Sequence, residues 1–387
     1  LNSPKKIASL KNIPIVQIAA GALHTVLLDK YGRVYAFGAG ELGQLGHGSK
    51  TKDYTYPKMI DSLGKIKIKN IAAGAYHTLL LSYDGRVFSF GENRSGQLGH
   101  GDEKPLHIPK AIKALSSVKI KSMSAGAHHT ILLAENGSIY TFGRGKLKQL
   151  GRGKEKDQSL PKILPFSEEK IIEATGGYSH TILLGQKGKV YTFGKVDFGA
   201  LGHGKESSIK KPRPLDKDAE KNPMALIGPP KLPPVKKKVP KPIKPIKPKK
   251  HQKRLTSITG TKHIATGWHH SVFLAKDQTV YTVGSGSWGQ LGHGTANNQG
   301  RPKKIKAIEN IPMKQVTAGP YFTALLAKDG RVFTTGQNTN GQLGHGNSKP
   351  LFSPKEITSL KGVVITQIAA GADHLILKTK DGGIYTV

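Results

Sequence analysis

Short apolar runs of five or six residues recur along the whole chain, separated by turns rich in glycine. In HTLLLSYDGRVFSFG, residues 77–91, two such runs flank an Asp-Gly pair, and HTILLAENGSIYTFG, residues 129–143, has Asn-Gly in its place. These pairs favour tight hairpins, because both central residues of the preferred two-residue turn need positive φ. No window shows a 3.6-residue apolar period over three turns, so the pattern predicts an all-β chain.

Seven copies of one motif precede these runs and set the period of the chain. They span residues 19–28, 72–81, 124–133, 175–184, 265–274, 317–326 and 369–378, and the first reads AAGALHTVLL. Successive copies are 51 to 53 residues apart, except for one step of 90 residues between the fourth and the fifth. Self-similarity at a fixed period indicates a repeat architecture, interrupted here by one insertion.

A second motif alternates with the first. GQLGHG occurs at 43–48, 96–101, 289–294 and 341–346, with the variants KQLGRG at 148–153 and GALGHG at 199–204. Seven units, each with several short strands, predict a seven-bladed β-propeller with one Lys/Pro-rich extended insertion. We assign blades 1–4 to residues 1–204, the insertion to 205–254 and blades 5–7 to 255–387, in one closed domain. The seventh unit stops at Val387, so we expect the ring to close between the C-terminal strand and the segment before Ile18.

The motifs A-G-x-x-H-T, D-G-x-V-Y-x-F-G and G-Q-L-G-H-G together resemble the regulator of chromosome condensation repeat, a family of seven-bladed propellers. The resemblance covers the chain outside the insertion, although Phe322 replaces the motif histidine in the sixth copy. The family includes an exchange factor for the Ran-type GTPase that docks on nucleosomes, organellar ribosome and RNA-processing factors, ubiquitin ligase domains and a plant ultraviolet-B photoreceptor. Photoreception needs clustered tryptophans, and the chain has only Trp268 and Trp288. A ligase would need a further catalytic domain.

The sixteen histidines and the glycine-rich loops do not form a convincing metal or nucleotide site. Eleven histidines occupy the two repeat motifs, and one histidine per blade cannot supply three or four ligands to a single metal. We therefore assign the motif histidines a structural role, with hydrogen bonds to backbone groups of a tight turn. GAGELG at 38–43 and GSGSWG at 284–289 match a dinucleotide fingerprint but lack the helix that it requires. With no cysteine and no catalytic motif, the sequence predicts neither a cofactor nor an enzyme.

Net charge changes the picture more than any motif. The chain carries 60 Lys and Arg against 25 Asp and Glu, a formal net charge of +35. Such an excess predicts a polyanionic partner, with nucleic acid as the first candidate. No apolar run approaches the roughly 20 residues that a membrane span needs, so we expect no span.

The repeats act as controls for one another, and two segments depart from them by gaining positive charge. The insertion, 205–254, has 17 Lys and Arg against four acids, and its prolines favour an extended strip that would lay charge along a phosphate backbone. The third linker, 143–156, reads GRGKLKQLGRGKEK where the second reads GENRSGQLGHGDEK. The predicted nucleic-acid-binding residues are Arg144, Lys146, Lys148, Arg152, Lys154, Lys231, Lys236, Lys237, Lys238, Lys241, Lys244, Lys247, Lys249, Lys250, Lys253 and Arg254.

Equivalent linkers of a propeller lie on one side, so we expect the third linker and the insertion to form one contiguous basic face over blades three to five. The basic segments contain no aromatic residues on which RNA bases could stack and no helix for a major groove. The alternative interpretation of the insertion is a solvated loop or a nuclear-import-like basic cluster.

The sequence therefore favours a non-catalytic propeller scaffold that binds structured RNA or ribonucleoprotein. We interpret it as a mitochondrial ribosome component or assembly factor, with rRNA and neighbouring ribosomal proteins as partners, because long Lys/Pro-rich strips are typical of ribosomal proteins. The alternative is a guanine-nucleotide exchange factor for a Ran-type small GTPase that docks on nucleosomal DNA in the nucleus. A Lys-Pro insertion is a poor substitute for the β-wedge with which the resembled exchange factor engages its GTPase, and this disfavours the alternative.

Overall fold

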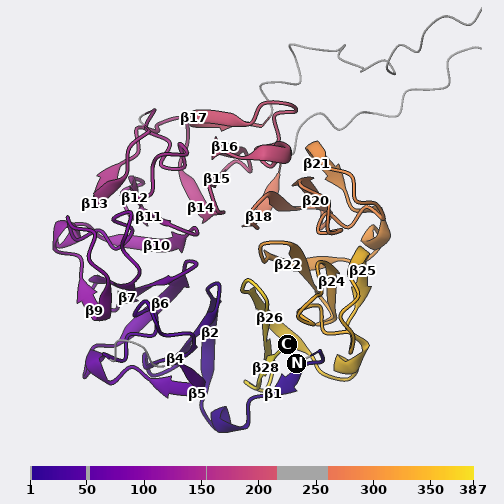
Figure 1. The fold of residues 1–387 in the computed structure, drawn as a ribbon, viewed down its shortest axis with the longest axis horizontal. Helices are drawn as coiled ribbons and strands as arrows, with labels where there is room; N and C mark the ends of the chain where they lie inside the picture. The colour runs from indigo at the N-terminus through magenta and orange to yellow at the C-terminus, as the bar shows by residue number, and fades with distance from the viewer. Residues whose placement is uncertain (1, 49–52, 154, 216–259) are drawn as a thin grey trace, which may run out of the picture.

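Seven antiparallel sheets of four strands stand around a common axis, which confirms the expected all-β, seven-bladed propeller (Figure 1). The computed structural model describes residues 2–48, 53–153, 155–215 and 260–387. The second strand of nearly every blade is buried along its whole length, because both of its faces pack against neighbouring strands and blades. A short, continuous apolar run is the sequence pattern of such a strand.

Each of the first four blades begins with its innermost strand. Blade 1 contains β2 (Ile15–Ala20), β3 (His24–Asp29), β4 (Val34–Gly38) and β5 (Tyr54–Met59). Blade 2 contains β6 (Ile68–Ala73), β7 (His77–Ser82), β8 (Val87–Gly91) and β9 (Leu106–Ala111). Blade 3 contains β10 (Ile120–Ala125), β11 (His129–Ala134), β12 (Ile139–Gly143) and β13 (Gln158–Ile163). Blade 4 contains β14 (Ile171–Gly176), β15 (His180–Gly185), β16 (Val190–Lys195) and β17 (Ser208–Pro214).

The remaining blades follow the same order. Blade 5 contains β18 (Thr261–Thr266), β19 (His270–Ala275), β20 (Val280–Gly284) and β21 (Gln299–Lys304). Blade 6 contains β22 (Met313–Ala318), β23 (Phe322–Ala327), β24 (Val332–Gly336) and β25 (Leu351–Glu356). Blade 7 contains β26 (Ile365–Ala370), β27 (Leu375–Thr379), β28 (Ile384–Thr386) and β1 (Lys5–Lys6). The short 3-10 helices are η1 (Ala8–Leu10), η2 (Asp61–Leu63), η3 (Lys113–Leu115), η4 (Asp197–Gly199), η5 (Lys306–Ile308) and η6 (Thr358–Leu360).

The ring closes in blade 7 by pairing the two ends of the chain. The N-terminal strand β1 is the outermost strand of this blade and pairs with β28, with Lys5 opposite Thr386 and Lys6 opposite Tyr385. The two termini accordingly lie close together (Figure 1). This confirms the expected closure between the C-terminal strand and the segment before Ile18.

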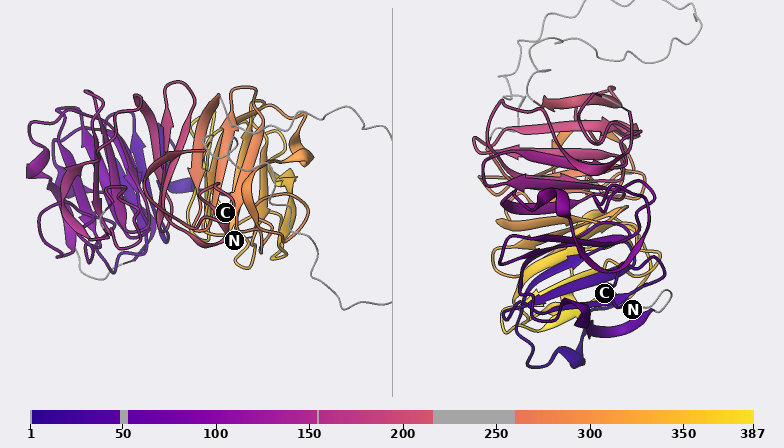
Figure 2. Two further views of the ribbon diagram at one scale, coloured as in Figure 1. Left: turned by 90° about the horizontal axis from the view of Figure 1, so that it is seen from above. Right: turned by 90° about the vertical axis from the view of Figure 1, so that its left-hand side faces the viewer.

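The strands run across the thickness of the disc, so each blade presents loops on two faces (Figure 2). The loop face carries the connections from first to second strand, such as 74–76, and the linkers from third to fourth strand, such as 92–105. The two kinds of loop are hydrogen bonded, since the Glu92 N–H donates to the Tyr76 carbonyl oxygen at 2.8 Å. The hairpin face carries the turns from second to third strand and the connections between blades.

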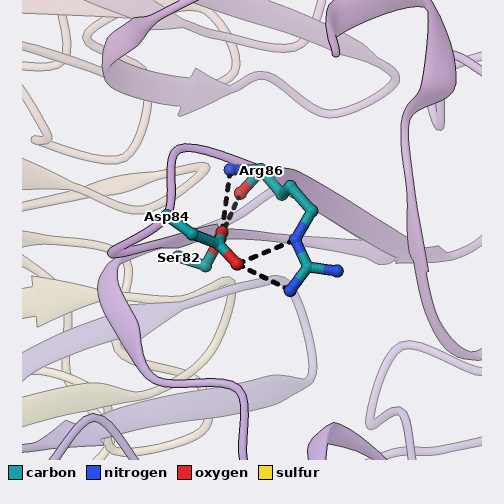
Figure 3. A network of polar contacts seen from close by, with 3 residues as sticks. All are labelled: Ser82, Asp84 and Arg86. Atoms are coloured by element: carbon teal, nitrogen blue, oxygen red, sulfur yellow. Dashed lines mark hydrogen bonds and ion pairs between the residues drawn. The ribbon is translucent and has the colours of Figure 1, made fainter.

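The Asp-Gly turns differ in type from the expectation. In blade 2 the Gly85 N–H donates to the Ser82 carbonyl oxygen at 3.1 Å, and the Ser82 N–H donates to that of Arg86 at 3.0 Å. The loop is therefore three residues long, and only its glycine has positive φ, 88°. The Asp84 carboxylate accepts hydrogen bonds from the Arg86 guanidinium and the Ser82 hydroxyl, which hold its pKa well below the usual range (Figure 3).

The motif histidines join neighbouring blades. His77 Nε2 lies 3.1 Å from the Thr130 hydroxyl of blade 3, which itself donates to the Gln97 carbonyl oxygen at 2.8 Å. Because the hydroxyl proton is engaged, the imidazole donates through Nε2. The same pairing occurs at five other seams, in His24–Thr78, His129–Thr181, His180–Ser271, His270–Thr323 and His374–Thr25. The role is structural, but the partner is a hydroxyl of the next blade and not, as expected, the backbone of a turn.

The glycine of A-G-x-x-H makes room for this imidazole. A Cβ added to Gly74 would lie 2.2 Å from Cε1 of His77, and the equivalent glycines show the same close approach. The motif therefore encodes one packed contact, a ring lying on a backbone that has no side chain. Any larger residue at the glycine would displace the histidine from its hydroxyl partner.

The outer strand of blade 4 lies inside the segment assigned to the insertion. In β17, Ile209 pairs with Gly194 and Pro214 pairs with Tyr191, as fourth strands do in the other blades. The expected boundary at residue 205 is therefore wrong, and residues 216–254 of the expected insertion lie outside the described residues. In the part of the chain that the structure describes, no helix is long and apolar enough to cross a membrane.

Candidate nucleic-acid interface

The third linker lies on the loop face, between β12 and β13. The Arg144 N–H donates to the His128 carbonyl oxygen at 2.8 Å, the same bond that Glu92 makes to Tyr76 in blade 2. At the far end of the linker, the Asp157 carboxylate accepts the Gly145 N–H at 2.9 Å. The first of these contacts is shared with blade 2, and the second has its counterpart in blade 1, where the Asp53 carboxylate accepts the Gly40 N–H at 2.9 Å.

Lys148 is held between blades and does not project into solvent. It replaces the repeat glycine and keeps the glycine conformation, with φ of 66°. Its Nζ lies 2.6 Å from the Ser208 hydroxyl of blade 4 and 3.1 Å from Glu155 Oε1, and its side chain is only 15% exposed. This lysine therefore joins the third linker to β17. We assign it a structural role in place of the predicted contact with nucleic acid.

Arg152 replaces the histidine of L-G-H-G. In four sister linkers that histidine lies within 3.0 Å of a hydroxyl on the third strand of its own blade, as His203 does with Thr192. Arg152 has a buried Nη1 with no hydrogen-bond partner, and burial lowers the pKa of its guanidinium. Arg152 thus lacks at Nη1 the hydrogen bond that the histidine makes in these sister linkers.

Among the described cations of this linker, Lys146 and Lys156 are exposed and Arg144 is half-buried. The Arg144 guanidinium lies 5.8 Å from the ring centroid of Tyr178, within the range of a cation–π contact. Lys146 is 72% exposed and lies 3.7 Å from Asp157. An exposed pair of this kind is weak, so Lys146 can exchange it for another anion.

The remaining predicted residues are not brought to this linker by the described structure. Lys154 and the eleven basic residues of 231–254 lie outside the described residues. The ends of that gap lie on the hairpin face, where the Leu215 N–H donates to the Val190 carbonyl oxygen and the Lys276 N–H donates to that of Gly260. The insertion thus interrupts a connection between blades, whereas the third linker joins two strands of one blade. The described residues do not form the expected contiguous basic face.

An aromatic rim runs part of the way around the axis on the loop face, and sequence reasoning missed it. It consists of Tyr76, His128, Tyr178, Trp268 and Tyr321, which come from the first loops of blades 2 to 6. Neighbouring ring centroids lie 5.2 to 6.4 Å apart. The basic segments themselves contain no Phe, Trp or Tyr, but the fold brings Tyr178 of another loop beside Arg144.

A signal for the rim was present in the repeats. The residue directly after the motif glycine is alanine or proline in five blades, at Ala22, Ala75, Ala127, Pro320 and Ala372. In blades 4 and 5 it is Tyr178 and Trp268. Comparing the copies position by position would have singled out both rings, but it would not have placed Arg144 beside one of them.

A central cavity of about 270 Å³ is lined mainly by alanine and glycine, and Trp268 is the rim residue that lines it. Farther along the innermost strands, Glu173 Oε1 lies 3.4 Å from His263 Nε2. Burial raises the pKa of Glu173 to about 8 and lowers the pKa of His263 to about 4, so both groups are neutral at pH 7. Among the described residues, no group of three or more His, Asp or Glu side chains could hold a metal ion.

Comparisons with known proteins agree with the repeat pattern. A model of the RCC1-like domain matches residues 1–229, and the regulator of chromosome condensation (RCC1) repeat matches 277–326 and 329–377. The chain is 32% identical to the ultraviolet-B receptor UVR8 of Arabidopsis thaliana, over 92% of this chain and 73% of that protein. It is 28% identical to the RCC2 homolog of Danio rerio, over 85% of this chain and 63% of that protein.

Two further matches are weaker, one because it covers little of the relative and the other because its sequence identity is low. The chain is 28% identical to the mouse E3 ubiquitin-protein ligase HERC2 over 96% of its own length, but it spans only 7% of that ligase. Prp20p of Saccharomyces cerevisiae, whose structure was studied with its binding to Gsp1p and histones, superposes with a TM-score of 0.74. It is 21% identical, and the match covers 97% of this chain and 82% of that one. At this identity the superposition shows a shared fold.

Proposed function

Because the chain belongs to the regulator of chromosome condensation (RCC1) repeat family, we propose that it is a regulatory scaffold that engages a small GTPase of the Ran type and docks on nucleosomal DNA. The relatives support this function over a ribosomal one, since Prp20p was studied with Gsp1p and histones. The observation that carries the docking half is the net charge of +35, which favours a polyanion as the surface on which the protein works. A nuclear location follows from this proposal.

The GTPase half is tested by nucleotide release. The full chain is added to a Ran-type GTPase loaded with a fluorescent guanine nucleotide, and release is followed with excess unlabelled nucleotide. We expect acceleration that depends on the concentration of the chain. An unrelated small GTPase is the control, and equal release from both would remove the exchange function.

A second candidate is a scaffold for structured RNA, as a component or assembly factor of the mitochondrial ribosome with rRNA and ribosomal proteins as partners. The composition of 231–254, eleven basic residues with no acid and six prolines, specifically favours it. In this candidate Arg144, Lys146 and the basic residues of that segment contact phosphates. A mitochondrial location belongs to this candidate.

Salt dependence and native partners separate the two candidates. Deletion of 231–254 should weaken binding to structured RNA, and the slope of log affinity against log salt should fall by roughly four to five if about six lysines contact phosphates. Purification from the native cell at low and high salt would identify the particle that co-sediments. Nucleosomes support the first candidate and ribosomal particles the second, while an unchanged slope would remove this segment from the interface.

A further inference from the structure

Blades 4 and 5 carry two rings that the scaffold does not need. Tyr178 and Trp268 occupy the position at which the other five blades have alanine or proline, so the propeller closes without an aromatic residue there. Their ring centroids lie 5.2 Å apart with planes at 50°, and both side chains are half-buried. The two rings are tilted and not stacked face to face, and each side chain keeps part of its surface exposed.

Two cations flank these rings, and they too are departures from the repeat. The first linker residue is Ala39, Glu92, Ser285 or Gln337 in four blades, but Arg144 in blade 3 and Lys195 in blade 4. The Arg144 guanidinium lies 5.8 Å from the Tyr178 ring centroid. The exposed Lys195 lies beside the same loop, where its N–H donates to the Ser179 carbonyl oxygen at 3.1 Å. The loop that carries Tyr178 is therefore in contact with two basic residues, with Arg144 through its ring and with Lys195 through its backbone.

A third aromatic residue, Phe198, lies next to these rings and has a strained backbone conformation. Phe198 has φ of 67°, a left-handed conformation that is rare for a bulky residue, and it leaves 53% of its surface exposed. Its ring lies 6.0 Å from that of His269, the residue after Trp268. Strained residues concentrate at binding and switch sites, because function there outweighs the cost in stability.

Acidic groups near the patch leave its charge positive. Glu92 is 8% exposed and lies within hydrogen-bonding distance of Gln97 and His128, so its carboxylate is used inside the molecule. Asp197 is the exposed acid beside Phe198. Glu155 is a second exposed acid, near enough to Lys195 to interact with it, but Lys148 already pairs with this carboxylate at 3.1 Å. The charge left open to a ligand is therefore that of Arg144 and Lys195, which disfavours a basic peptide and favours an anionic ligand.

We propose that Tyr178, Trp268, Arg144 and Lys195 form a binding site for single-stranded nucleic acid. Bases stack on the two rings and phosphates lie against the two cations, which is how proteins bind single strands without reading their sequence. A duplex cannot use this site, because its bases are already paired and stacked. The inference goes beyond the proposed function, because nucleosomal DNA is a duplex and would not occupy this site, and it is independent of the GTPase.

Intrinsic fluorescence gives a direct test, because the chain has only two tryptophans. In the full chain carrying Trp288→Phe, Trp268 is the sole tryptophan. This protein is titrated with a single-stranded RNA of about eight nucleotides, the DNA of the same sequence, the duplex, and an abasic strand with the same phosphates. We expect saturable quenching by the single strands and none by the duplex or the abasic strand. The RNA and DNA arms show which single strand is preferred.

Matched variants locate the site. In the same background Tyr178→Leu should weaken single-strand binding roughly 5- to 100-fold, the range for loss of one stacked base. Trp268→Phe, assayed by anisotropy of a labelled strand, should retain most affinity, whereas Trp268→Leu should not. Tyr31→Leu removes a tyrosine that is 54% exposed on the hairpin face and should change nothing. Arg144→Gln, which leaves both rings in place, should reduce the salt slope by about one.

The outcomes also separate this inference from the proposed function. Equal affinity for the abasic and the normal strand, or unchanged affinity in Tyr178→Leu and Arg144→Gln, would overturn the stacking site. Nucleosome or structured-RNA binding that persists in those variants would leave the proposed function standing. Quenching of Trp268 by an acidic peptide but not by single strands would replace the nucleic acid with a protein ligand and would also overturn the inference.

Discussion

The seam between blades 2 and 3 and the seam between blades 6 and 7 solve one packing problem with opposite chemistry. In the first, the imidazole of His77 bonds to the hydroxyl of Thr130 at 3.1 Å. In the second, Phe322 replaces the histidine and Leu375 replaces the threonine, and both are fully buried in one apolar cluster. Both members of the pair have changed together, which is what a contact between them requires.

The comparison shows that the seam depends on a matched pair and not on histidine itself. A buried polar group without a partner costs more than the hydrogen bond contributes, so one polar member alone is the unfavourable case. The shape requirement is shared, since a Cβ on Gly319 would lie 2.1 Å from the Phe322 ring as one on Gly74 would from the His77 ring. The motif glycine thus requires a flat ring three residues later. Whether that ring is polar or apolar depends on the partner residue in the next blade.

Lowering the pH should destabilise the polar seams and leave the apolar seam unaffected. This is the largest change in stability that we expect. Burial lowers the pKa of His24, His77, His129, His180 and His270 to about 3 and that of His374 to about 4. These groups stay neutral in the folded chain while unfolded chains protonate below pH 6.5, so the stability they contribute is lost as pH falls. Six such groups remove roughly 7 kcal/mol between pH 7 and 5.5.

Urea unfolding measured from pH 7.5 to 4.5 checks this expectation. Uptake of at least about five protons on unfolding at pH 5.5 is the expected signature, because the six seam histidines gain charge together and other buried histidines, such as His263, add to them. The apolar seam contributes nothing to it. A free energy of unfolding that stays flat between pH 7 and 5 would contradict buried, neutral seam histidines.

Replacing one polar member of a seam with an apolar residue should have the next largest effect on stability. His77→Phe leaves the Thr130 hydroxyl without its imidazole donor and should lower the free energy of unfolding by about 2 kcal/mol. His77→Phe with Thr130→Leu copies the pair of blades 6 and 7 and should recover about 1 kcal/mol of the loss. A double-mutant cycle by chemical denaturation measures the coupling, and additive losses would show that the two side chains act separately.

The converse change should be slightly milder. Phe322→His places a buried N–H opposite Leu375 and should cost about 1–2 kcal/mol, whereas adding Leu375→Thr should return stability to within about 1 kcal/mol of the parent. Thermal melting of the parent, Phe322→His and the double variant at pH 7.5 measures these differences in stability. The double variant should also be more acid-sensitive than the parent, since it gains a seventh buried histidine.

The smallest expected effect concerns Lys148, where blade 3 departs from the glycine of its sisters. Lys148→Gly should stabilise the chain by up to about 1 kcal/mol, because relief of the left-handed conformation exceeds loss of the contact with Ser208. Gly96→Lys is the matched control in blade 2 and should destabilise, because a Cβ there would lie 2.4 Å from Ser159 Cα. A loss of stability in Lys148→Gly would mean that the link to β17 outweighs the strain.

The sequence by itself determined the number of blades, the order of strands and the closure of the ring. The seven copies of A-G-x-x-H report a local requirement, a ring lying on a glycine three residues earlier, and such requirements repeat wherever the local structure repeats. The continuous apolar runs likewise report strands buried on both sides. For the same reason the chain revealed its own departures at Lys148, Arg152 and Phe322.

Only the tertiary structure decided which residues meet across blades. The partner of His77 is 53 residues away, and Arg144 meets Tyr178 only because blade 4 places its first loop beside the linker of blade 3. Strand pairing also assigned 208–214 to blade 4 and put the ends of the following gap on the face opposite the third linker. Contacts of this kind depend on how complete sheets stack around the axis, and a repeat pattern along the chain carries no record of that stacking.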